Sequence, residues 1–72
     1  MDYKIVHNNG DAYYEHTIII PYSEMDDDQL SKIKKWCAAT FSYNWKYVHG
    51  MESLIIYLAS DRELNMFRLR WS

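Results

Sequence analysis

Two short stretches near the start of the chain, residues 3–7 and 13–20, are rich in the aromatic and β-branched residues that favour β-strands. The segment between them, Asn8-Asn9-Gly10-Asp11, is a strong turn signal because Asn and Gly tolerate positive φ angles. The pattern therefore predicts a β-hairpin. A turn centred on the Asn-Gly pair places Lys4 opposite Glu15, and their opposite charges support this register.

A second hairpin is predicted where the turn His49-Gly50-Met51-Glu52 joins residues 43–47 to residues 53–58. In the register that this turn sets, large side chains of both strands share one side of the sheet, as a core requires. The aromatic run before the turn is therefore predicted to pack inside rather than to bind a ligand. The facing pairs are Tyr47 with Leu54, Trp45 with Ile56 and Tyr43 with Leu58.

A helix is predicted between the hairpins. Asp26 is followed three residues later by Gln29, which is the pattern of a capping box, and the helix is expected to end near Thr40. Acidic residues at its start suit the positive end of the helix dipole. Its apolar positions recur at helical spacing: Leu30, Ile33, Cys37 and Phe41.

A second helix is predicted at the end of the chain, where Ser60-Asp61-Arg62-Glu63 repeats the capping-box pattern. Leu64, Phe67 and Trp71 would then share one side of that helix. Residues 67–71 also alternate as a strand would. We favour the helix because the cap is well placed and because Arg, Leu and Met suit helices.

The element order ββαββα predicts an α+β fold of two layers, in which both helices lie on one face of a four-stranded, largely antiparallel sheet. Residues 1–72 are interpreted as a single domain, and the sequence leaves the order of the strands open. The covered face is expected to carry Tyr3, Ile5, Tyr14, Ile18, Ile20, Tyr43, Trp45, Tyr47, Leu54, Ile56 and Leu58. The other face is expected to carry Lys4, Val6, Tyr13, Glu15, Thr17, Ile19, Asn44, Lys46, Ile55 and Tyr57.

Composition narrows the class of protein. A chain of 72 residues is near the lower limit for a hydrophobic core that is stable without disulfides or a structural metal. Its 17% of aromatic residues adds apolar surface that folding can bury. One cysteine cannot form an internal disulfide, which favours a reducing compartment. No apolar stretch is long enough to cross a bilayer, and a formal charge of −2 gives no electrostatic case for duplex DNA. The sequence predicts a cytoplasmic protein without a membrane partner.

No motif for catalysis, metal binding or a cofactor is present in the sequence. His7, His16 and His49 lack the spacing of a zinc site, and one cysteine cannot supply the missing ligands. Cys37 lies on the apolar stripe of its helix, where a free cysteine is usually a small buried hydrophobe rather than a nucleophile. The acidic run before that helix lacks the ligand pattern of a calcium loop. These observations predict a non-enzymatic protein with no metal and no cofactor.

The sheet face turned away from the helices is the candidate binding surface, because its expected residues are too apolar for a solvated face. Tyrosine is enriched at partner-binding surfaces. The arginines near the C-terminus could bind a phosphate or a carboxylate. They could also only place positive charge at the negative end of the helix dipole. The predicted partner-binding residues are Val6, Tyr13, Ile19, Lys46, Ile55, Tyr57, Arg68 and Arg70.

The ending Ser60-Asp61-Arg62-Glu63-Leu64-Asn65-Met66-Phe67-Arg68-Leu69-Arg70-Trp71 resembles the close of many small proteins of tailed bacteriophages. The resemblance implies a phage accessory protein, in the host cytoplasm, that binds and modulates a larger host or phage protein. Two alternatives stay open. In one, Tyr13 and Tyr57 stack the bases of a single-stranded nucleic acid. In the other, the chain is a small structural subunit that self-associates.

Overall fold

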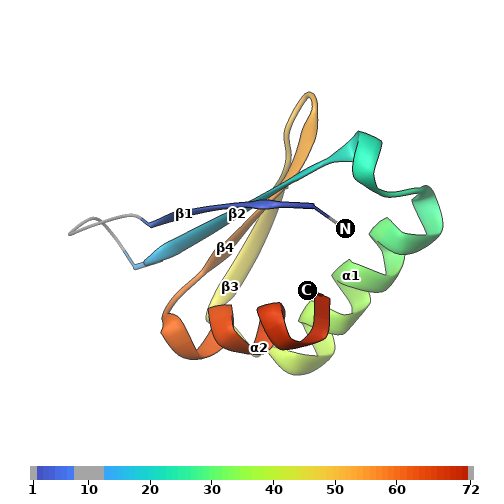
Figure 1. The fold of residues 1–72 in the computed structure, drawn as a ribbon. Helices are drawn as coiled ribbons and strands as arrows, with labels where there is room; N and C mark the ends of the chain where they lie inside the picture. Colours follow the sequence, from blue (N-terminus) through green and yellow to red (C-terminus); the bar gives the residue numbers. More distant parts are fainter. Residues whose placement is uncertain (1, 8–12, 72) are drawn as a thin grey trace.

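The computed structural model describes residues 2–7 and 13–71. The elements follow the predicted order (Figure 1). They are β1 (Lys4–His7), β2 (His16–Pro21), a 3-10 turn (Tyr22–Glu24), α1 (Asp27–Thr40), β3 (Trp45–His49), β4 (Ser53–Leu58) and α2 (Asp61–Trp71). All neighbouring strands are antiparallel, in the order β1-β2-β4-β3. Both helices lie on one face of the sheet, which confirms the two-layer α+β prediction (Figure 1).

The core lies between the sheet and the two helices. The central strands β2 and β4 contribute alternate residues to it, as period-two patterning requires. The helices contribute residues three or four positions apart. The buried apolar residues are Ile18, Ile20, Ile33, Cys37, Phe41, Leu54, Ile56, Leu58, Leu64 and Phe67.

Both helices begin directly after the residues predicted to cap them, Asp26 and Ser60. The carboxylate of Asp26 accepts a hydrogen bond from the backbone N–H of Gln29, at 2.8 Å, and α1 ends at Thr40 as predicted. At the start of α2 the Ser60 hydroxyl donates to the carboxylate of Glu63. Residues 61–71 are helical, so the alternative of a terminal strand is wrong.

The register of the first hairpin differs from the prediction. Lys4 lies opposite Ile19 rather than Glu15, a shift of four residues, because β2 begins only at His16. The predicted turn, residues 8–11, lies outside the described residues. A shift by an even number keeps every strand residue on its expected face, so Ile5 stays on the core side although it pairs with Ile18 rather than Tyr14.

The second hairpin is also shifted, by two residues: Tyr47 lies opposite Ile56 rather than Leu54. The loop is tighter than expected, because the N–H of Gly50 donates to the carbonyl of Ser53 at 2.9 Å. A Cβ atom on Gly50 would stand 2.9 Å from that same carbonyl, which explains why glycine is used here. Strand parity is again preserved.

Five residues do not lie where the sequence placed them. Glu15, expected on the uncovered face, lies close to His16 and Asp61 at the start of α2. Tyr43 is 81% exposed and lies before β3, which begins only at Trp45. Tyr47 is 40% exposed on β3, which is an edge strand. Trp45 is the member of that run that packs against the core. Tyr14 packs with residues of the uncovered face, and Asn44 bonds to Glu63 of α2 instead of joining that face.

Candidate functional site

The sheet face opposite the helices, called the open face below, is the first candidate site. Along β2 and β4 its members alternate with core residues, and no helix lies over this face of the sheet (Figure 1). The strand order brings together residues that are distant in sequence. The strand residues of the open face are Lys4, Val6, Thr17, Ile19, Pro21, Lys46, Val48, Ser53, Ile55 and Tyr57.

One corner of the open face is aromatic. The rings of Tyr14 and Tyr57 lie 6.0 Å apart, and the ring of Tyr13 meets that of Tyr14 edge-on at 4.9 Å. The ammonium of Lys46 stands 5.4 Å from the Tyr14 ring and 5.1 Å from the Tyr57 ring. Each such cation–π contact stabilises an exposed pair by about 0.5–1 kcal/mol. Lys46 is therefore held in place between two rings rather than free in solvent.

The rest of the open face is aliphatic. Ile19 and Ile55 pair across β2 and β4, and the edge strands add Val6 and Val48, which are 37% and 44% exposed. Thr17 is buried among these side chains. The result is an apolar strip of Val48, Ile55 and Ile19 across β3, β4 and β2, bordered by the aromatic corner. On β1 the direct partner of Ile19 is Lys4, and Val6 lies diagonal to it.

The charge of the open face is positive. Lys4 and Lys46 are its charged strand residues, and neither forms an ion pair within the part of the chain that the structure describes. The whole chain, in contrast, has ten acidic and eight basic residues. The strand residues of the open face therefore present apolar surface with two lysines, and Asp2, just before β1, lines a hollow with Lys4 and Ile19.

The structure brings most of the predicted binding residues together. Tyr13 borders the open face, and Val6, Ile19, Lys46, Ile55 and Tyr57 lie on it. Arg68 and Arg70 do not join them, because α2 belongs to the other layer. They are exposed there, and the Arg70 guanidinium lies 4.2 Å above the ring of Trp71. Sequence reasoning missed Tyr14, since strand parity counted through residues 13–15 is meaningless where those residues are not in a strand.

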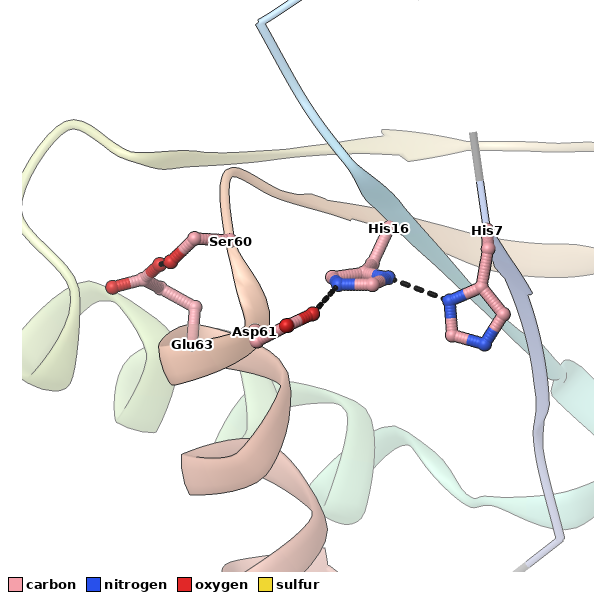
Figure 2. A network of polar contacts seen from close by, with 5 residues as sticks. All are labelled: His7, His16, Ser60, Asp61 and Glu63. Carbon is pink, nitrogen blue, oxygen red and sulfur yellow. Dashed lines mark hydrogen bonds and ion pairs between the residues drawn. The ribbon is translucent and has the colours of Figure 1, made fainter. Parts of the chain in front are cut away.

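A second group of polar side chains lies at the start of α2. His16 stands between Asp61 and His7, with its Nε2 atom 2.6 Å from a carboxylate oxygen of Asp61 and its Nδ1 atom 2.8 Å from Nδ1 of His7 (Figure 2). Glu63 points to the opposite side of the same helical turn. Its carboxylate accepts hydrogen bonds from the Ser60 hydroxyl and from the Asn44 amide, at 2.7 Å for the amide.

Cys37 is buried in the core, as its place on the apolar stripe predicted. Burial raises the pKa of its thiol from 9.0 to about 12, because the thiolate would lose its hydration. The thiol is therefore protonated at neutral pH and closed to solvent. Both properties argue against a role as a nucleophile.

Comparisons with known proteins add no relatives: no family model, no curated protein and no solved structure matches this chain. Among the described residues, neither helix has the length and apolar content needed to traverse a lipid bilayer.

Proposed function

We propose that this protein is a non-enzymatic interaction module, and that its open face binds an apolar surface with an acidic rim on a larger protein. The observation that carries the proposal is the apolar strip of Val48, Ile55 and Ile19 across three strands, with Val6 beside it on β1 and no covering helix. Contiguous exposed apolar surface of this kind is typical of partner-binding sites in small domains.

Charge complementarity defines the partner's chemistry. The open face has basic strand residues and no acidic ones, so carboxylates around an apolar patch would complement it. Lys46 is already oriented by Tyr14 and Tyr57, which lowers the entropy cost of using it in binding. The resemblance of residues 60–71 to the ends of small phage proteins supports an accessory role, with a host or phage protein as the partner.

The aromatic corner of the open face, where Lys46 lies over two tyrosine rings, favours a protein partner over a single-stranded nucleic acid. Bases stack on free aromatic faces. Here the ammonium of Lys46 lies over the rings of both Tyr14 and Tyr57. Stacking a base on either ring would displace this cation, whereas an acidic side chain could contact it where it stands.

The test is affinity purification from the native cell, identification of the bound protein, and measurement of its affinity for purified variants. Lys46→Glu reverses the charge of the aromatic corner and should weaken binding at least tenfold, on the order of the effect of a central interface residue. Lys35→Glu, at an exposed position of α1 away from this surface, is the matched control and should bind like the wild type.

A second pair of variants tests the apolar contribution. The double change Tyr13→Ser and Tyr57→Ser should abolish binding, while Tyr43→Ser, an equally aromatic and more exposed position outside the open face, should not. Circular dichroism would show that the variants stay folded. An unchanged affinity for Lys46→Glu and for the double variant would exclude the open face.

Two further results would also overturn the proposal. One is tight binding of an unstructured oligonucleotide at low salt, which would identify a nucleic-acid-binding surface. The other is a dimer in sedimentation experiments that dissociates on the Tyr13→Ser and Tyr57→Ser change, which would show that the open face pairs two copies of this chain.

A further inference from the structure

We infer that His16, Asp61 and Glu15 form a site for a zinc ion at the start of α2, on the helix side of the sheet and independent of the open face. The three residues offer one nitrogen and two oxygens that all lie within 4.8 Å of one another. An imidazole with two carboxylates is a donor set that suits Zn²⁺.

The imidazole is fixed before any ion arrives. His16 is 6% exposed, and it is held between Asp61 on one side and His7 on the other (Figure 2). Its Nε2 atom, 2.6 Å from the Asp61 oxygen, is the nitrogen on the carboxylate side. A zinc ion bound to Nε2 would therefore share a side with the Asp61 carboxylate.

The two carboxylates supply charge that the surroundings leave uncompensated. Glu15 precedes β2 and Asp61 begins α2, and both are exposed. Within the described part of the chain neither forms an ion pair with a lysine or arginine. Their exposure also leaves room for water to complete the coordination of an ion.

His7 would act as the orienting group behind the ligand. Histidines that bind metals commonly donate their second ring N–H to a neighbouring acceptor. The Nδ1 atom of His16 lies 2.8 Å from Nδ1 of His7, so it can donate there once Nε2 holds the metal. This contact makes His7 a positioning residue and not a ligand.

Zinc binding at this site requires no net release of protons from the imidazoles of His16 and His7. With both rings neutral and no metal bound, the two contacts fit a His16 that donates from Nε2 to Asp61 and a His7 that donates from Nδ1 to His16. With zinc on Nε2 of His16, the ring carries its proton on Nδ1 and donates to His7, whose own proton then sits on Nε2. Each neutral imidazole has one proton before and after, so only the tautomers change.

The experiment is calorimetric titration of the full chain, freed of metal by a chelator, with zinc chloride. The expected result is one Zn²⁺ per chain, with no comparable binding of Mg²⁺. Binding should be lost in Asp61→Asn and in Glu15→Gln, which alter exposed residues and keep hydrogen-bonding side chains. His7→Gln should weaken binding about 10–100-fold, as loss of an outer-shell partner does.

Asp27→Asn is the matched control, because Asp27 is the first residue of α1 as Asp61 is of α2. It should bind zinc as the wild type does. With Co²⁺ in place of zinc, visible absorption should appear in the wild type and vanish in Asp61→Asn. Absence of zinc binding, binding that survives Asp61→Asn, or an equal loss in Asp27→Asn would each overturn the assignment.

Discussion

The buried thiol of Cys37 predicts how the protein's stability depends on pH in the alkaline range. The folded state holds the pKa of this thiol at about 12, against 9.0 when it is exposed. Above pH 9 the unfolded chain releases the proton while the folded chain keeps it. The unfolded state is then favoured, so the free energy of unfolding contributed by this group falls as pH rises from 9 toward 12.

The size of the effect follows from the separation of the two pKa values. Between about pH 8 and about pH 10.5, the unfolded chain gains roughly 2 kcal/mol from ionising this one thiol, at about 1.4 kcal/mol per pH unit. Tyrosines and lysines titrate in the same range, so the change in total stability is not informative by itself. The informative quantity is the difference between the wild type and Cys37→Ala.

Urea unfolding, followed by circular dichroism at both pH values, measures that difference. Cys37→Ala leaves a small cavity and should be less stable at pH 8. Its disadvantage should shrink by about 2 kcal/mol at pH 10.5, because the variant has no thiol to ionise. A gap that stays constant across this range would show that the thiol ionises equally in both states, and the inferred burial would be wrong.

Two other substitutions test the core and the first helix cap by urea unfolding. Phe67→Ala should cost about 3–5 kcal/mol, since this fully buried ring packs against Tyr3 and Trp36, and a loss below about 1 kcal/mol would contradict the packing. Asp26→Ala should cost about 1 kcal/mol through loss of the hydrogen bond to Gln29, whereas Asp26→Asn should keep most of it; equal losses in both would show that charge matters more than the cap.

The sequence was sufficient for the elements and for strand parity, but not for register. A period-two pattern fixes which side a residue faces, and any slip by an even number satisfies it equally well. The observed registers differ from the predicted ones by such even steps, four residues in the first hairpin and two in the second. The pattern also could not predict that Tyr47 is exposed, because the sequence does not determine that β3 lies at the edge of the sheet. Tyr43 lies outside β3, which begins at Trp45, two residues after the predicted start.

The two candidate sites also differ in how far the sequence predicts them. Residues of the open face follow from strand parity, so Val6, Ile55 and Tyr57 were found from the sequence. The contact between His16 and Asp61 joins positions 45 residues apart, and no local spacing signals it. Arg68 and Arg70 were grouped with the sheet although the amphipathic pattern of their helix already assigned them to the other layer.

The strand order has a consequence for how the chain reaches its native state. β2 and β4 form the centre of the sheet, and Ile18 meets Ile56 across a long stretch of intervening chain. The first hairpin and α1 therefore leave the ribosome before the strand that completes their core has been synthesised. Such non-local pairing slows folding, because a large loop must close before the contacts form. The two ββα halves, despite their similar layout, must acquire structure together.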